Sequence, residues 1–422
     1  MRTTKNSGFE WIGEIPTSWE LYKGKYMFTQ RNLRGNTIEL QLLSPTQKYG
    51  VVPQSVYEDR SGMNAVKLNK NANLSALKTI HKGDFCISLR SFQGGFEYSE
   101  YEGVVSPAYQ VFYPVVKVAR GYYKYLFKDS GFIEKMNSYT MTLRDGKNIA
   151  FADFGNTYIP CPPVDEQQRI ADFLDAKCAE IDALVADIQS QIDTLEQYKR
   201  SVITETVTKG LNPNAEMKDS GIQWIGDMPA HWNVIRGKYI LHYMQKPVRE
   251  DDGVITCFRD GEVTLRSNRR EDGFTMSDKE IGYQGIDVGD LVVHGMDGFA
   301  GSIGISDSRG KASPVLNVLD TDQCKRYIMY YLRSMAYSDV FLALATGIRV
   351  RSCDLRWNKL AELSYPVPPL DEQNAIVKHI DSVLSKADAV IADKKAQLAT
   401  LDEYKKSLIF EYVTGKKEVP VS

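Results

Sequence analysis

The sequence lacks a strong net charge, paired cysteines and long apolar runs. Its 52 Lys plus Arg and 54 Asp plus Glu give a formal net charge of -2, which excludes a globally basic nucleic-acid binder. The six cysteines form no Cys-x-x-Cys pair, so we expect a reducing, cytoplasmic location rather than a disulfide framework or zinc ribbon. No apolar run approaches the roughly 18 residues of a membrane span, and the N-terminus has no signal-peptide core, so no membrane contact is expected.

Catalytic patterns are also missing. Gly310-Lys311 lacks the rest of a phosphate loop, and the five histidines form no metal-binding pattern. Four glycines spaced three apart, from Gly295 to Gly304, do not match a dinucleotide fingerprint and indicate a flexible loop or a close backbone approach to a ligand. We therefore predict that the chain is not itself an enzyme and needs no cofactor of its own.

What the sequence does contain is an internal duplication. Residues 8–26 and 221–239 agree at nine of 19 positions, including the two tryptophans of W-I-G-x-x-P-x-x-W. P-P-x-D-E-Q follows at 162–167 and again at 368–373, and seven of 11 positions match between the segments that start at Tyr198 and Tyr404. The ordered recurrence of three motifs predicts two halves with one plan.

Each half opens with a mixed segment, residues 1–160 and 213–366. Short β-type runs such as 110–113 and 290–294 alternate with turn dipeptides and with short helical stretches at 121–128 and 326–335. We predict an internally duplicated α+β fold with one compact α+β domain in each half.

Each half closes with a long helix, predicted within residues 161–212 and 367–422. The paired prolines mark the start, and the Asp-Glu pairs that follow are read as stabilising the helix N-terminus rather than as acid/base groups. Heptad spacing predicts a coiled-coil rod of about 60 Å. Its obvious partner is the other copy, although an ordinary helical hairpin remains an alternative. The predicted seam and partner-binding residues are Leu174, Ile181, Leu184, Ile188, Leu195, Tyr198 and Val202 in the first helix, and Ile380, Val383, Ala387, Val390, Leu401, Tyr404 and Leu408 in the second.

Local basic patches lie in the mixed segments. Arginine beside Gln, Asn, Ser and aromatic residues on Gly-rich loops suits contacts to phosphates and base edges, although most surface arginines are only solvated. The candidate DNA-binding residues are Arg31, Arg34, Arg90, Ser91, Gln93, Arg144 and Lys147 in the first half, and Arg259, Arg266, Arg269, Arg270, Arg349, Arg351 and Arg356 in the second.

The duplicated W-I-G-x-x-P-x-x-W, P-P-x-D-E-Q and Y-K-x-S-x-I motifs resemble the specificity (S) subunit of type I restriction-modification systems over the whole chain. The resemblance implies two target recognition domains separated by two long antiparallel coiled-coil helices, with pseudo-two-fold symmetry. Each domain would read one half of a split, asymmetric target in double-stranded DNA, and the helices would fix the gap.

The same resemblance implies two methyltransferase (M) subunits that use S-adenosylmethionine, and restriction (R) subunits that use ATP and Mg. No motif of the family assigns individual DNA-contacting residues to positions of this sequence. The candidate residues above are therefore chosen by residue chemistry alone. The alternative reading is a structural adaptor whose two α+β domains bind protein partners.

Overall fold

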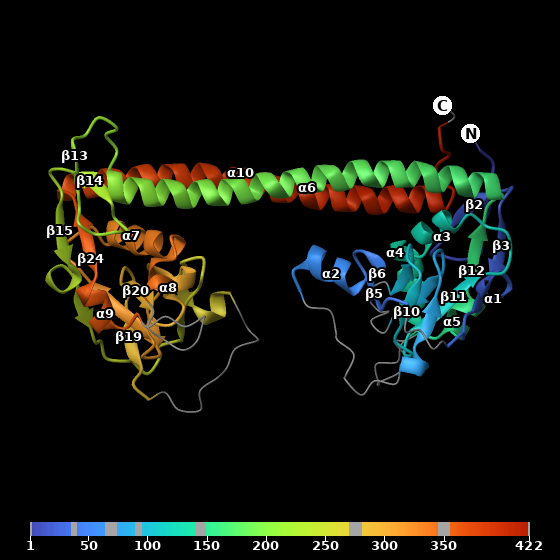
Figure 1. Cartoon of the computed structure of the whole chain (residues 1–422), viewed down its shortest axis with the longest axis horizontal. Coiled ribbons are helices and arrows are strands. Elements are labelled where there is room, and N and C mark those ends of the chain that lie inside the picture. Colours follow the sequence, from blue (N-terminus) through green and yellow to red (C-terminus); the bar gives the residue numbers. More distant parts are fainter. Residues whose placement is uncertain are drawn as a thin grey trace. The chain divides into compact units, whose positions relative to one another are not determined.

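The computed structural model describes residues 2–34, 40–63, 74–88, 95–139, 149–269, 281–344 and 355–420. The chain divides into two compact units (Figure 1). The first unit comprises residues 1–188 and 396–422, and the second comprises residues 189–395. Each unit therefore holds one mixed domain together with part of each long helix.

The first unit is built on the four-stranded sheet β4-β11-β8-β9, with all neighbours antiparallel. The predicted run at 110–113 is β11, and the predicted helix at 121–128 is α3. The strands are β1 Thr4–Asn6, β2 Glu14–Pro16, β3 Glu20–Lys23, β4 Phe28–Gln30, β5 Leu43–Thr46, β6 Gly50–Pro53, β7 Lys78–Ile80, β8 Phe85–Ile87, β9 Phe96–Tyr98, β10 Gly103–Val105, β11 Gln110–Pro114 and β12 Tyr158–Cys161. The short helices are α1 Gly24–Met27, α2 Gln54–Ser61, α3 Arg120–Leu126, α4 Ser130–Ser138 and α5 Phe151–Asn156.

The second unit repeats this plan with the antiparallel sheet β16-β23-β20-β21. The predicted elements at 290–294 and 326–335 are β20 and α7. The strands are β13 Met217–Asp219, β14 Asp227–Pro229, β15 Asn233–Arg236, β16 His242–Met244, β17 Ile255–Cys257, β18 Val263–Leu265, β19 Gln284–Ile286, β20 Leu291–His294, β21 Ile303–Ile305, β22 Gly310–Ala312, β23 Leu316–Asp320 and β24 Ser364–Val367. The short helices are α7 Lys325–Tyr337, α8 Val340–Ala343 and α9 Trp357–Glu362.

The cores of the two domains differ in chemistry although their topology agrees. Phe85 and Phe112 face each other across β8 and β11 in the first unit, with their ring centroids 5.4 Å apart. Leu291 and Leu319 form the matching pair on β20 and β23. All four side chains are buried. A core tolerates such exchanges when its volume and pattern are kept, which explains how the two halves drifted in sequence but kept one fold.

Both predicted long helices are present, as α6 Val164–Lys209 and α10 Leu370–Val413. The carbonyl of Pro163 accepts the first backbone hydrogen bonds of α6, so Asp165 and Glu166 lie in its first turn. Gly210 follows α6 with φ +74°, a left-handed conformation that suits glycine at a helix end. Within the described residues, no helix combines the length and apolarity needed to cross a bilayer.

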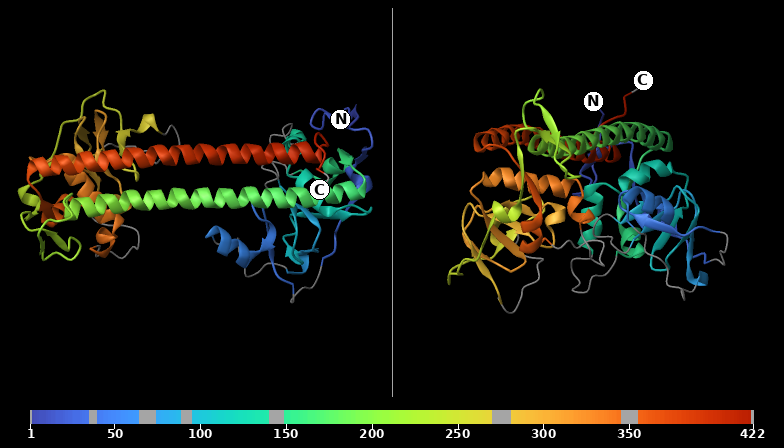
Figure 2. Two further views of the ribbon diagram at one scale, coloured as in Figure 1. Left: turned by 90° about the horizontal axis from the view of Figure 1, so that it is seen from above. Right: turned by 60° about the vertical axis from the view of Figure 1, so that its left-hand side comes forward.

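The two long helices run antiparallel alongside each other in each unit (Figure 2). In the first unit, Phe173 of α6 stacks on Tyr412 of α10 at 4.5 Å, and Asp182 pairs with Lys405 at 2.6 Å. In the second unit, Lys199 of α6 pairs with Asp388 of α10 at 2.6 Å. Residue numbers rise along α6 as they fall along α10, so the pairing predicted from the heptads is confirmed.

The contact between α6 and α10, termed the helix seam, uses one predicted row of residues. In that row Leu174, Ile181, Ile380, Ala387 and Leu408 are buried, and Ile188, Leu195, Val202 and Leu401 are half-buried. The second predicted row is wrong by one position. Leu184, Tyr198, Val390 and Tyr404 are exposed, and only Val383 of that row is half-buried.

The true second row lies one residue further along each helix. Cys178, Ile192 and Ile391 are buried there, and Val185 and Leu384 are half-buried. Lys199 and Lys405 occupy the same row and reach carboxylates on the opposite helix. Along α6 the seam therefore runs through Leu174, Cys178, Ile181 and Val185, in steps of four, three and four residues, and continues in this alternation.

Candidate nucleic-acid interface

A carboxamide side chain at the start of the inner strand β11 binds the chain at residues 149–151. Gln110 of β11 donates from Nε2 to the carbonyl of Ile149 at 2.8 Å. Its Oε1 accepts from the backbone N–H of Phe151 at 2.7 Å and from Nε2 of Gln30 at 3.3 Å. Ile149 is the first described residue after the segment that contains Arg144 and Lys147, so Gln110 anchors the chain at the end of that segment.

Asn317 of β23 does the same in the second domain. Its Nδ2 donates to the carbonyl of Leu355 at 2.9 Å and to that of Val293 at 3.2 Å. Leu355 is the first described residue after the segment that contains Arg349 and Arg351. Sequence analysis missed this pair of anchors, although their spacing of 207 residues is close to that of the repeated motifs.

Most candidate DNA-binding residues fall outside the described ranges. The structure therefore assigns them no position or contact. These residues are Arg90, Ser91, Gln93, Arg144, Lys147, Arg270, Arg349 and Arg351.

The two described candidates of the first domain lie in different surroundings. The Arg31 guanidinium reaches both carboxylate oxygens of Asp84, at 2.6 and 3.2 Å, and stacks over the ring of Tyr113 at 4.2 Å. The Asp84 side chain is 1% exposed. Arg31 thus has the structural task of compensating a buried carboxylate. Arg34, beyond the end of β4, is exposed.

The described candidates of the second domain gather around one turn. Arg259 pairs with Asp297 at 3.3 Å, and the backbone N–H of Leu355, the neighbour of Arg356, donates to the carbonyl of Gly295 at 2.9 Å. The β17–β18 hairpin, the 295–298 turn and the start of α9 therefore meet, and they bring Arg259 and Arg356 to one part of the domain.

Two further candidates follow β18 directly and contact the β17–β18 hairpin. Arg269 stacks over Phe258 at 4.2 Å and pairs with Asp260 at 2.7 Å and Glu262 at 2.9 Å. Arg266 donates to Oγ1 of Thr256 at 3.3 Å. Exposed ion pairs of this kind contribute little to stability, so Arg269 can exchange its carboxylate partners for another anion at low cost.

The glycines of the ladder allow close approaches within the chain itself, whereas the sequence predicted a flexible loop or an approach to a ligand. A Cβ on Gly304 would lie 1.9 Å from the carbonyl oxygen of Gly261 in the hairpin turn. One on Gly298 would lie 2.5 Å from Cδ1 of Leu355. These glycines let β21 and the 295–298 turn pack directly on the hairpin and on the segment that carries Arg356.

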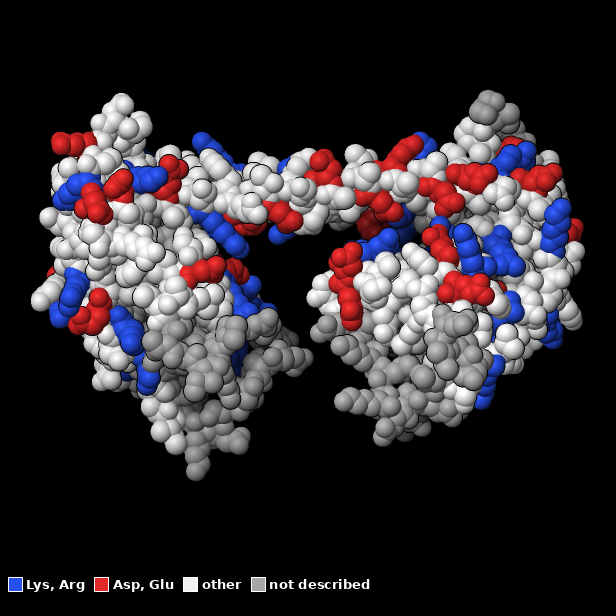
Figure 3. Space-filling view, viewed as in Figure 1, with Lys and Arg blue, Asp and Glu red and all other residues white. Residues whose placement is uncertain are grey.

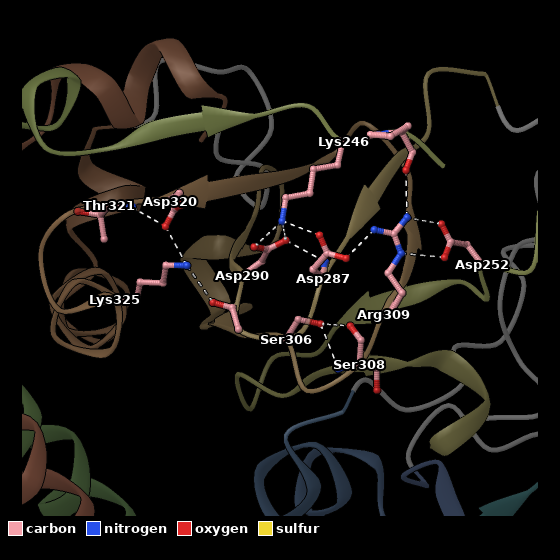
Figure 4. A network of polar contacts seen from close by, with 12 residues as sticks. Lys246, Asp252, Asp287, Asp290, Ser306, Ser308, Arg309, Asp320, Thr321 and Lys325 are labelled. Carbon is pink, nitrogen blue, oxygen red and sulfur yellow. Dashed lines mark hydrogen bonds and ion pairs between the residues drawn. The ribbon is translucent and has the colours of Figure 1, made fainter. Parts of the chain in front are cut away.

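A separate ion-pair network fixes the rim of the second domain (Figure 4). Arg309 binds Asp252 at 2.8 Å and Asp287 at 2.6 Å, and Lys246 binds Asp287 at 2.9 Å and Asp290 at 2.7 Å. Hydrogen bonds from Lys246 and Arg309 lower the pKa of Asp287 to about 2. Since these two cations are held by carboxylates, they tie the 246–252 segment to the turn between β19 and β20 and to the start of β22 rather than adding to the basic patches.

The described residues on the face shown in Figure 3 carry no field of one sign. On the face shown in Figure 3, Lys and Arg alternate with Asp and Glu over the described parts of both units. Together with the net charge of -2, this face provides local basic groups instead of a continuous basic track over its described residues.

Comparison with known proteins identifies the domain type. Residues 17–194 match the family model described as the type I restriction modification DNA specificity domain. The putative type I restriction enzyme MjaX specificity subunit of Methanocaldococcus jannaschii is 26% identical over 275 residues, which cover 62% of this chain and 59% of that protein. The type I restriction enzyme EcoBI specificity subunit of Escherichia coli is 21% identical over 319 residues, with 68% and 64% covered. The matched region thus spans about three fifths of the length of these relatives.

Solved structures agree with the fold. A chain from a structure concerning complex assembly and conformational transition of the type I R-M system aligns with a TM-score of 0.69 at 15% identity, covering 96% of this chain and 99% of that one. The HsdS subunit from Thermoanaerobacter tengcongensis aligns with a TM-score of 0.51 at 15% identity, with 98% and 100% covered. Residues 17–194 thus match a type I restriction modification DNA specificity domain, and the chain is similar in sequence to type I specificity subunits and in fold to these solved structures, in agreement with the resemblance that its repeated motifs carry.

Proposed function

We propose that this chain reads a bipartite, asymmetric DNA target, with one recognition domain for each half-site. The observation that carries the proposal is the duplicated domain with unlike residues at matching places. Matching positions of the inner strands β11 and β23 carry Gln110 and Asn317, which anchor the ends of two segments that differ in sequence, with Arg144 and Lys147 in one and Arg349 and Arg351 in the other. Base readout depends on the donors and acceptors that a surface presents, so two copies of one fold with different side chains suit two different half-sites.

The long helices would set the gap between the half-sites. The chain runs through α6 from one unit into the other, and α10 returns beside it within each unit. A helix rises about 1.5 Å per residue, and paired helices bend less than a single one. The number of helical residues between the domains would therefore determine how many base pairs are left unread.

The exposed residues of the mispredicted row would dock the methyltransferase subunits. Leu184 and Tyr404 are 53% and 54% exposed in the first unit, and Val390 and Tyr198 are 44% and 51% exposed in the second. An aliphatic and an aromatic side chain on each helix pair suit the apolar face of an added helix. Two equivalent stripes in one chain suit two M subunits.

The catalytic activities would then reside in the partners. S-adenosylmethionine would be bound by the M subunits, and ATP and Mg by the R subunits, while this chain selects the DNA site without acting on it chemically. The mixed charge of the described surface supports this division of roles between the chain and its partners. The partners would then provide most of the electrostatic binding to the DNA phosphates.

The test is a map of adenine methylation in cells with and without this chain, co-expressed with its M subunit. We expect one split motif that disappears when the chain is removed. Purified complex should bind that DNA more weakly as salt rises. A methylation map that does not depend on the chain, together with a salt-insensitive protein interaction, would favour the adaptor alternative instead.

A further inference from the structure

The two repeated motifs of each half touch each other. Nε1 of Trp19, from W-I-G-x-x-P-x-x-W, donates to Oε2 of Glu166, from P-P-x-D-E-Q, at 3.0 Å. Trp232 makes the same bond to Glu372 at 3.1 Å. Both tryptophans are 0% exposed. The glutamates were read as helix-dipole residues from the sequence, but each one is also the acceptor that ties a domain to the start of a long helix.

Each tryptophan also packs on the end of the opposite long helix. Gly415, just after α10, has φ +73°, and a Cβ added there would lie 2.9 Å from Cη2 of Trp19. Gly210, just after α6, has φ +74°, and its Cβ would lie 3.1 Å from Cζ2 of Trp232. In each unit one indole therefore contacts the first turn of one helix and the terminus of the other.

Three more hydrogen bonds repeat between domain and helices. A glutamine of the motif accepts a domain backbone N–H, one tyrosine donates to a carbonyl in the last turn of the opposite helix, and a second tyrosine donates to an aspartate on the nearer helix. In the first unit these are Ala119 to Gln167 at 2.9 Å, Tyr122 to Val413 at 2.6 Å and Tyr125 to Asp175 at 2.6 Å. In the second they are Cys324 to Gln373 at 3.0 Å, Tyr327 to Val207 at 3.0 Å and Tyr330 to Asp381 at 2.6 Å.

We call this set of contacts the helix joint. The helix joint keeps the same residue types in both halves, whereas the sheet cores exchange Phe85 for Leu291 and Phe112 for Leu319. The two domains share these contacts although the half-sites proposed for them differ. Contacts that are the same in both domains therefore serve to hold each domain in a fixed position on the helices and not to read a base sequence.

We infer that the helix joint is a second determinant of the gap, because it fixes the angle at which each recognition domain leaves the helix pair. This inference rests on the proposed function. One added base pair moves a half-site by about 3.4 Å and turns it by about 34°. A domain held to both helices by buried indole and tyrosine contacts cannot follow that movement, whereas a loosened domain can.

The test weakens the joint from its exposed side. The Asp175 side chain is 52% exposed, so Asp175→Ala combined with Asp381→Ala removes two acceptors without opening the core. Asp172→Ala is the matched control, because Asp172 lies on the same helix and its carboxylate accepts from Gln168 and not from the domain. Tyr125→Phe combined with Tyr330→Phe removes only the two tyrosine hydrogen bonds and keeps the ion pairs of Asp175 with Lys124 and of Asp381 with Arg326.

The complex of the full chain with its methyltransferase subunit is assayed on DNA with the correct gap and with gaps one base pair shorter and longer. Loss of a hydrogen bond to a charged group is expected to reduce discrimination against the wrong gaps about tenfold. The penalty for a base change within a half-site should stay the same, and Asp175→Asn with Asp381→Asn should restore part of the lost gap discrimination.

Two results would overturn the inference. One is unchanged gap discrimination in both the aspartate and the tyrosine pairs, with thermal unfolding showing that the variants are folded. The other is an equal loss of half-site and gap discrimination. If the unaltered complex shows no preference for any gap, the proposed function fails as well, which separates that failure from a failure of the joint alone.

Discussion

The corrected helix seam makes a sharp prediction about two residues one turn apart on α6. Ile181 is 5% exposed and Leu184 is 53% exposed. Truncating a buried isoleucine to alanine removes its packing and leaves a cavity, so Ile181→Ala should lower the free energy of unfolding by about 3 kcal/mol. Leu184→Ala should change it by less than about 0.5 kcal/mol, since alanine is a better helix former and little packing is lost.

Thermal unfolding of the full chain, followed by far-UV circular dichroism, measures both variants. For a unit of this size, about 3 kcal/mol corresponds to a fall of about 6 to 12 °C in the midpoint of the first unit's transition. Binding of the methyltransferase subunit should show the opposite order, with Leu184→Ala the weaker binder at a temperature where both variants are folded. A larger loss of stability in Leu184→Ala would refute the seam as described and restore the row first predicted.

Further predictions concern charges in the first domain and the length of the helices. Burial raises the pKa of Glu97 from its ordinary 4.5 to about 7, so the folded chain keeps a proton that the unfolded chain releases, and stability should fall by about 3 kcal/mol as pH rises through that interval. Glu97→Gln should flatten this slope in denaturation measured at several pH values, and an unchanged slope would assign it to another group. Arg31→Ala should cost about 3 kcal/mol by leaving buried Asp84 unpaired, whereas Arg34→Ala should leave stability unchanged and reduce the salt dependence of DNA binding by about one phosphate contact. Equal loss of stability in the two arginine variants would contradict this difference. Seven residues inserted into both long helices should lengthen the gap without altering the half-sites.

The elements with strong local patterns could be predicted from the sequence. The paired prolines and sustained heptads predict α6 and α10, and glycine marks the end of α6. The alternation of short apolar runs and turns predicts β11 and β20. Internal repetition then fixes the order of the parts, because a motif that recurs with constant spacing identifies equivalent elements in both halves.

The second row of the helix seam could not be decided by pattern alone. Leu184 and Val185 are both apolar, so a heptad permits either one as the next contact after Ile181. The buried Ile192 and the exposed Gln191 decide between them seven residues further along α6. Lys199 and Lys405 made this second row difficult to recognise in the sequence. A lysine in an apolar row looks like an interruption of the row until its carboxylate partner on the other helix is known.

The candidate interface depended on contacts between distant residues, which spacing does not reveal. Arg31 and Asp84 are 53 positions apart, and only the folded sheet shows that this arginine compensates a buried carboxylate. The anchors Gln110 and Asn317 bind backbone carbonyls about 40 residues further along the chain. Residue chemistry could therefore identify arginines as candidates for DNA contact. It could not distinguish an arginine that compensates a buried carboxylate from one that is free to bind DNA.

The central claim is that the paired helices set the spacing of the two half-sites. The most direct measurement inserts one heptad after Ile188 and one after Lys395, where the chain passes between the two units, and maps adenine methylation in cells. Seven residues add about 10 Å of helix, so the methylated motif should keep both half-sites and gain up to about three base pairs between them. An unchanged gap, or half-sites of altered sequence, would contradict the account.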